Sequence, residues 1–223
     1  MLGKKIIFAI SLILMLVSIS AVFFYAPIEK TMGLVQKIFY FHVASAWVGF
    51  LAFGVVFIMS ILFLWKKNIA YDIWAASSAE IGVLFTTLVL LTGPMWAKPV
   101  WNTYWTWDPR LTTTLILWLI YVGYLLLRNM IDSPEKAARI SAVFGIIGFV
   151  DVPVVYMSIR WWKTLHPEHV MLMGGENSGL HPKIFQTLML SLLTFTFLYL
   201  ALLLVRTQLE KTKQEVDFLK RNI

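Results

Sequence analysis

Four histidines and ten tryptophans are the side chains in this chain whose chemistry is best suited to ligand binding. His166, His169 and His181 fall in one late segment, whereas His42 stands far from them at the start of an apolar run. Six of the tryptophans gather in two groups, at positions 96 to 107 and 161 to 162. Imidazole nitrogens are common metal ligands, and aromatic walls with a few polar groups are typical of small-molecule sites. The pattern therefore indicates a ligand site that uses both side-chain types.

The absence of cysteine limits the metal chemistry, because it excludes disulfides, thiolate sites and the C-x-x-C-H motif for covalent haem attachment. Zinc needs a compact set of three or four ligands. His166 and His169 have a suitable separation, but Pro167 interrupts the turn that would bring them and Glu168 together. Haem explains more of the pattern, since two imidazoles from different elements can ligate iron from opposite faces while indoles pack on the macrocycle. Four cations are candidate partners for its propionates: Lys98, Arg110, Arg160 and Lys163.

Composition shows that a membrane must position these residues. Apolar residues make up 59% of the chain and charged residues 14%, and the mean hydropathy is +0.76. A water-soluble domain has about 45–50% apolar and about 25% charged residues. Six apolar runs are long enough to cross a hydrocarbon core of roughly 30 Å as helices, at residues 6–26, 43–65, 73–95, 111–127, 140–159 and 184–205. We therefore predict an all-α, polytopic membrane protein with six transmembrane helices.

The distribution of cations predicts the orientation of these helices. Twelve of the 19 Lys and Arg residues belong to one set of connections and the two tails, and seven belong to the other set. Because cations accumulate on the cytoplasmic side, both termini are predicted to be cytoplasmic. We expect the membrane to be the cytoplasmic (inner) membrane of a bacterium or archaeon. Residues 1–205 then form a membrane domain with outer loops at 27–42, 96–110 and 160–183, and residues 206–223 form a cytoplasmic amphipathic tail.

This topology places all four histidines and both tryptophan groups on the outer side of the membrane. An interfacial aromatic belt would populate both margins evenly. The inner margin carries only Trp65 and Trp74, so the outer tryptophans indicate a ligand site rather than a belt alone. The same bias of Lys and Arg accounts for the net charge of +7, and no nucleic-acid partner is expected.

Three stretches resemble a known family. Residues 99–112 (PVWNTYWTWDPRLT) are similar to the tryptophan-rich "WWD" loop of the haem-handling proteins of cytochrome c biogenesis. Residues 40–47 (YFHVASAW) resemble the ligand-histidine segment of the CcmC branch, and residues 148–166 resemble its fifth helix and second-histidine loop. Asn102 stands where that pattern usually has glycine, and Tyr104 where it often has tryptophan. The larger haem lyases share the loop but have more helices, so the short chain favours the CcmC branch.

The resemblance implies a role for each residue of the site. His42 and His166 would be the axial ligands of a non-covalent, b-type haem, with His169 and His181 as alternatives to His166. The remaining site residues implied are Trp101, Trp105, Trp107 and Asp108 as a platform, and Arg110. The partners implied are a membrane-anchored, CcmE-like haem chaperone, which receives the haem, and the CcmA-, CcmB- and CcmD-like subunits of an ATP-binding-cassette complex.

No pattern in the sequence indicates an enzyme, since there is no G-x-x-x-x-G-K-[ST] loop and no nucleophile motif. The alternative function is a membrane transporter for haem or a small solute. Glu80 and Asp151 lie within predicted spans, where a charge costs at least about 2.5 kcal/mol, so each is expected to be protonated or paired. Transporters normally contain repeated broken helices, and proline is expected to interrupt only the span of Pro153. Haem presentation is therefore the preferred function.

Overall fold

The computed structural model describes residues 2–30, 32–166 and 180–221, and these residues are almost entirely helical. No strand occurs in this part of the chain, apart from one isolated bridge between Glu29 and Gly33. The elements are α1 (Leu2–Ser20), a π-helical turn (Ala21–Tyr25), a 3-10 turn (Leu34–Lys37), α2 (Ile38–Lys66), α3 (Ile69–Trp101), α4 (Pro109–Met130), α5 (Pro134–Phe149), α6 (Asp151–Trp161) and α8 (Pro182–Arg221).

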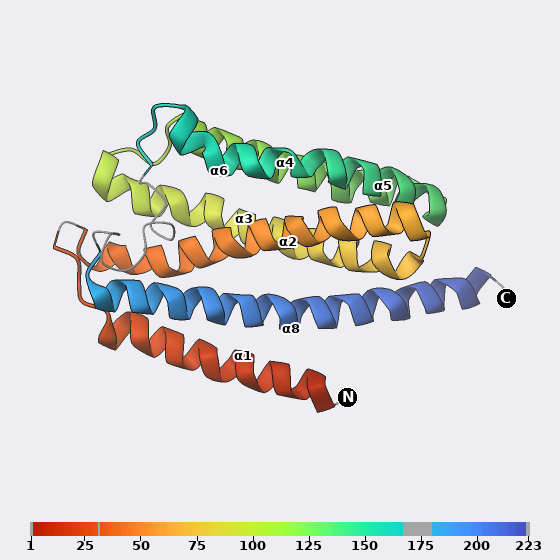
Figure 1. Cartoon of the computed structure of the whole chain (residues 1–223), viewed down its shortest axis with the longest axis horizontal. Coiled ribbons are helices and arrows are strands. Elements are labelled where there is room, and N and C mark those ends of the chain that lie inside the picture. The colour runs from red at the N-terminus through yellow and green to blue at the C-terminus, as the bar shows by residue number, and fades with distance from the viewer. Residues whose placement is uncertain (1, 31, 167–179, 222–223) are drawn as a thin grey trace.

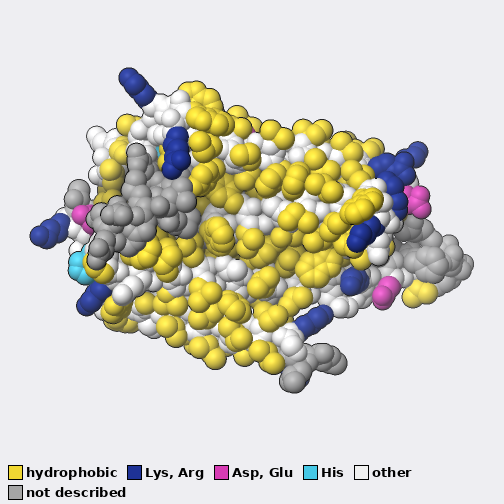
Figure 2. All heavy atoms as spheres, viewed as in Figure 1, with side chains coloured by type: hydrophobic (Ala, Val, Ile, Leu, Met, Phe, Trp, Pro, Cys, Tyr) yellow, Lys and Arg dark blue, Asp and Glu magenta, His cyan; other side chains and the backbone are white. Residues whose placement is uncertain are grey.

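Six helical segments of the described chain are long and apolar enough to cross a membrane, which confirms the predicted fold class. They are Gly3–Tyr25, Leu34–Lys66, Ile69–Trp101, Pro109–Met130, Pro134–Trp161 and Pro182–Val216. Figure 2 shows apolar side chains in a broad band over the visible face, with Lys and Arg toward its two ends. The chain is a multi-pass membrane protein.

Several helices extend beyond the predicted spans. Residues 34–42 and 96–101 were expected to be loop, but they continue α2 and α3 as helix. The length of an apolar run reports the thickness of the hydrocarbon core, whereas a helix continues wherever its backbone hydrogen bonds are satisfied. Pro94 and Pro99 both lie inside α3, so the expectation of a single proline-interrupted span is wrong. α8 has 40 residues, about 60 Å at 1.5 Å per residue, and runs unbroken through Arg206.

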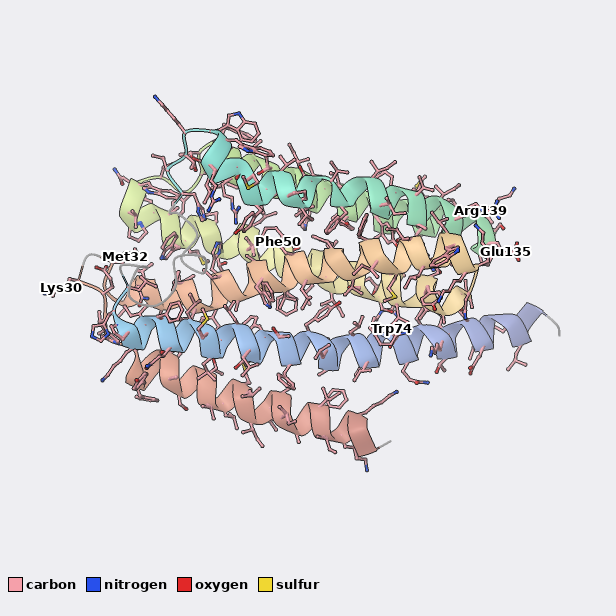
Figure 3. All side chains as sticks on the ribbon, viewed as in Figure 1. Lys30, Met32, Phe50, Trp74, Glu135 and Arg139 are labelled. Carbon is pink, nitrogen blue, oxygen red and sulfur yellow. The ribbon has the colours of Figure 1, made fainter. Side chains whose placement is uncertain are left out.

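The helices pack in layers around the antiparallel pair of α2 and α3 (Figure 1). α8 packs on one side of this pair and carries α1 on its outer face, while α4, α5 and α6 cover the other side. Both termini lie at the same end of the bundle (Figure 1). The opposite end, formed by residues 26–30, 102–108 and 162–166, is here named the distal end. Lys30 and Met32 lie at the distal end, and Glu135 and Arg139 lie at the end of the termini (Figure 3).

Tight packing in the half of the bundle nearer the termini closes the space between the layers. The rings of Phe53 and Tyr121 stack with centroids 3.6 Å apart, and Tyr121 and Tyr124 are fully buried. Gly82 lets α3 approach Phe53, because a Cβ there would lie 2.5 Å from the ring. Side chains therefore fill the space between α2, α3 and α4 at this level.

Ion pairs join the helices near the same end. Arg128 of α4 donates two hydrogen bonds, of 2.6 and 2.5 Å, to the buried carboxylate of Asp72 in α3. Glu80 of α3 is paired with Arg206 of α8, as the need to neutralise an intramembrane charge predicts. Asp151 lies, as predicted, inside the fifth span (Pro134–Trp161), at the junction of α5 and α6 where Val150 keeps helical backbone angles, and its Oδ2 is buried with no hydrogen-bond partner among the described residues.

Candidate functional site

A cavity of about 500 Å³ lies in the distal half of the bundle, between the α2–α3 pair and the layer of α4 and α6. Five of the seven predicted site residues belong to its described lining: His42, Trp101, Trp105, Arg110 and His166. The other two, Trp107 and Asp108, lie outside the lining. Most of the remaining lining is apolar, with Phe39, Val43 and Phe50 from α2 and Val89, Leu90 and Ala97 from α3 among its members.

His42 lies one turn into α2 and faces α3. Its Nδ1 is 2.9 Å from Oγ1 of Thr92, and its ring is stacked with Trp96 at a centroid distance of 6.5 Å and an interplanar angle of 18°. Trp96 is buried and meets the ring of Trp101 edge-on at 6.4 Å. Hence His42 is held against an aromatic wall that α3 provides.

His166 reaches the same cavity from the segment after α6, and Asp108 holds this segment in place. The Asp108 carboxylate accepts hydrogen bonds from Thr164 Oγ1 at 2.7 Å and from the Leu165 amide at 2.8 Å. It also caps α4 by accepting from the Arg110 amide at 2.9 Å. Asp108 is only 8% exposed, so these bonds are shielded from water. One carboxylate thus joins the start of α4 to the two residues that precede His166.

The tryptophan-rich segment contributes side chains in two directions. Trp105 lines the cavity, whereas Trp107 is 76% exposed and meets Trp105 edge-on at 5.7 Å. Asn102 ends α3 in the left-handed conformation, with φ of 55°. This conformation is the one in which glycine is most favoured and which asparagine also tolerates.

Arg110 is the only charged side chain among the described residues that line the cavity. Its Nη1 donates to the backbone carbonyls of Val155 and Tyr156 in α6, and its guanidinium lies 5.8 Å from the Phe50 ring centroid. Figure 3 places Phe50 between α2 and the layer above it. Arg110 therefore ties α4 to α6 while it lines the cavity.

The other candidate cations and histidines lie elsewhere. Lys98 donates to the Asn102 carbonyl at 2.9 Å, and Arg160 and Lys163 are exposed and outside the lining. His181 is exposed at the start of α8, where its Nδ1 accepts from the Lys183 amide at 3.2 Å. His169, the other alternative to His166, lies outside the described residues. The described residues contain no group of three or more His, Asp or Glu side chains that could hold a metal ion in the manner of zinc.

Sequence reasoning missed features at and beside the cavity. It did not identify Thr92, which contacts His42 but does not line the cavity. Trp96 was expected in the tryptophan group of the site, but in a loop, whereas it lies on α3. Val89, Gly93 and Trp96 follow the three-to-four spacing of one helix face. Val89 and Gly93 already lie inside the predicted span 73–95, and the same periodicity reaches Trp96 once the helix is extended beyond residue 95.

The fold and the cavity define a multi-pass membrane protein in which two imidazoles line one largely aromatic and aliphatic cavity. Comparisons with known proteins identify its family. The family model described as "CcmC: Heme exporter protein C" matches residues 3–222. A Bradyrhizobium diazoefficiens protein named "Heme exporter protein C" is 39% identical over 87% of this chain and 74% of its own length. The protein of that name from Rhodobacter capsulatus is 34% identical over 84% of this chain and 78% of its own length.

A protein from Marchantia polymorpha, named "Putative cytochrome c biosynthesis ccmC-like mitochondrial protein", is 36% identical over 78% of this chain and 72% of its own length. The chain belongs to the CcmC family. This membership, anticipated by the resemblance of the three stretches, places the chain among the haem-handling membrane proteins of cytochrome c maturation.

Proposed function

We propose that the chain binds haem non-covalently in the distal cavity, at the outer face of the cytoplasmic membrane, with His42 and His166 as axial ligands. It presents this haem to a membrane-anchored, CcmE-like chaperone and works with CcmA-, CcmB- and CcmD-like subunits, without catalysing a reaction itself. The observation that carries the proposal is that His42 and His166, from separate elements, line one cavity together with Trp101, Trp105 and Arg110.

The donor set of the cavity fits an iron porphyrin. The described lining contains two imidazoles and no carboxylate, which matches bis-histidine ligation of haem and not a zinc site. The volume of about 500 Å³ lies within the range of roughly 300–1,000 Å³ that is usual for small-molecule sites. The aromatic and aliphatic walls suit a flat macrocycle, and the guanidinium of Arg110 supplies a cation for a propionate.

In this proposal, some residues around the cavity hold the ligand and others present it to the recipient. Trp96 and Thr92 fix the His42 ring from α3, while Asp108 fixes the segment that carries His166. Trp107 lies outside the cavity and is largely exposed, so we assign it to the surface that meets the recipient chaperone. Because one ligand is held by a helix and the other by a short segment bound to Asp108, opening of the contacts to Asp108 would free His166 while α2 keeps His42 in place.

The alternative, transport of haem or a solute through the bundle, draws support from the buried Oδ2 of Asp151 within the fifth span, which has no hydrogen-bond partner among the described residues. A transport path would have to pass the half of the bundle nearer the termini. There Phe53, Tyr121 and Tyr124 are fully buried and pack against one another. This filled core favours binding and presentation at the distal end.

The test uses protein purified in detergent from cells supplied with haem. We expect a Soret band in the wild type that is lost in the His42→Ala, His166→Ala double variant. His181→Ala is the matched control, because His181 is exposed and lies outside the cavity lining; this variant should retain the band. A colourless wild type, or a double variant with an unchanged Soret band, would contradict the proposal.

A further inference from the structure

The contact between His42 and Thr92 determines which nitrogen of the imidazole carries the hydrogen. Thr92 Oγ1 is 2.9 Å from Nδ1 of His42 and 2.7 Å from the backbone carbonyl oxygen of Leu88. A threonine hydroxyl has one hydrogen to donate and two lone pairs to accept with. The Leu88 carbonyl can only accept, so it takes the hydrogen of the hydroxyl. Toward His42, Thr92 must therefore act as an acceptor.

An acceptor at Nδ1 requires that Nδ1 carries the proton, which leaves the lone pair on Nε2. We propose that Thr92 is a positioning residue that holds His42 in the Nδ1–H tautomer, with Nε2 available to bind iron; this inference rests on the proposed haem site. Metal-ligating histidines commonly donate their second ring N–H to a partner that fixes tautomer and ring orientation. In this chain a neutral hydroxyl from the neighbouring helix performs that role.

Two neighbours on α3 hold the ring in the same pose. Trp96, one turn after Thr92, is stacked with the imidazole at an interplanar angle of 18°. Gly93 lies beside the ring, since a Cβ at that position would lie 3.4 Å from Cε1 of His42, in van der Waals contact. Stacking fixes the plane of the ring, and the hydrogen bond to Thr92 selects the ring flip in which Nδ1, rather than Cδ2, faces α3. Together they set the direction in which Nε2 points.

The choice of a hydroxyl has a consequence for ligand strength. A carboxylate partner would make a charge-assisted hydrogen bond about twice as strong as a neutral one, and would raise the basicity of the imidazole further. The hydroxyl of Thr92 orients His42 without that additional donation to iron. This suits a protein whose ligand must be held and then given away.

The first experiment measures the tautomer directly in the haem-free full-length protein in detergent. We expect the ¹⁵N chemical shifts of labelled histidine, assigned by loss of one signal in His42→Gln, to show His42 as the Nδ1–H tautomer. In Thr92→Val, which keeps the shape but removes the acceptor, the signal should shift toward the Nε2–H form. Thr92→Ser should retain the wild-type pattern. A wild-type His42 in the Nε2–H form would overturn the inference.

The second experiment measures the consequence for haem. Thr92→Val should bind haem roughly 10- to 100-fold more weakly, the usual cost of losing a partner of a metal-bound histidine, with shifted ferric electron paramagnetic resonance g-values and reduction potential. Thr87→Val is the matched control: Thr87 also donates to a carbonyl, of Val83 at 2.7 Å, but accepts from Trp118 instead, at 2.8 Å. It should leave the haem signals unchanged.

The proposed haem site and the proposed role of Thr92 would be contradicted by different results. If the wild type binds haem and His42→Ala loses the low-spin, bis-imidazole signal, but Thr92→Val keeps wild-type affinity, g-values and potential, then Thr92 is not a positioning residue and the haem site stands. If His42→Ala keeps the wild-type haem spectrum, then the proposed site itself is wrong.

Discussion

The hydrogen bonds of Asp108 allow a quantitative prediction for the attachment of His166. In Asp108→Ala, the segment before His166 loses two hydrogen bonds to a buried charged group, from Thr164 and from Leu165. Hydrogen bonds to charged groups contribute about 1.5–3 kcal/mol each, so the loss is at least roughly 3 kcal/mol. Since 1.4 kcal/mol corresponds to a factor of ten, His166 should be held in the cavity roughly 100-fold less tightly.

The assay is the coordination state of ferric haem in purified protein. We expect Asp108→Ala to convert haem from six-coordinate low-spin toward a five-coordinate high-spin form held by His42, and added imidazole to restore the low-spin spectrum. Thr164→Val leaves the cap of α4 and the bond from the Leu165 amide to Asp108 intact, but it removes both the bond to Asp108 and the bond that Thr164 Oγ1 accepts from the His166 amide. It should therefore also shift the haem toward the high-spin form, without the loss of the α4 cap. Circular dichroism reports whether loss of the cap, which costs about 1 kcal/mol, also disturbs the helix. Low-spin haem with wild-type affinity in Asp108→Ala would contradict the claim that Asp108 holds the segment that carries His166.

Three further predictions concern the aromatic surface and the bundle. Trp105→Ala should weaken haem retention, because Trp105 lines the cavity. Trp107→Ala should leave retention intact and slow transfer to the chaperone, because Trp107 is exposed outside the cavity. Equal effects of the two variants in retention and transfer assays would contradict these separate roles. Arg128→Met should destabilise the protein by about 3–5 kcal/mol, since Asp72 would remain as an unpaired buried charge. Thermal unfolding in detergent measures this, and addition of Asp72→Asn should recover most of the loss. Gly82→Ala should cost about 1–3 kcal/mol by overpacking against Phe53, while Gly54→Ala, whose nearest contact is 3.9 Å, should unfold at the wild-type temperature.

The sequence predicts the helices well because lipid leaves the backbone no alternative to internal hydrogen bonding. It predicts their ends poorly, since apolar run length stops at the hydrocarbon boundary while α2 and α3 continue beyond it. The sequence predicts that Glu80 is protonated or paired, because an isolated charge in a span is costly. It does not predict that the partner is Arg206, because Arg206 lies on a helix far along the chain.

The residues of the site also differ in whether the sequence alone could identify them. His42 and the tryptophans could be found from residue type and from the resemblance of short stretches to a family. Thr92 and the tether from Asp108 to Thr164 could not, because each depends on contact between elements far apart in the chain. No local spacing encodes such a contact, so it appears only when the helices are packed.

The ligation of haem iron by His42 and His166 is tested most directly by ferric electron paramagnetic resonance of the wild type and of each single alanine variant. We expect a low-spin, bis-imidazole signal in the wild type and in His181→Ala. His42→Ala and His166→Ala should each lose it and show a high-spin signal. A bis-imidazole signal that persists in either of these two variants would contradict the assignment of the ligands.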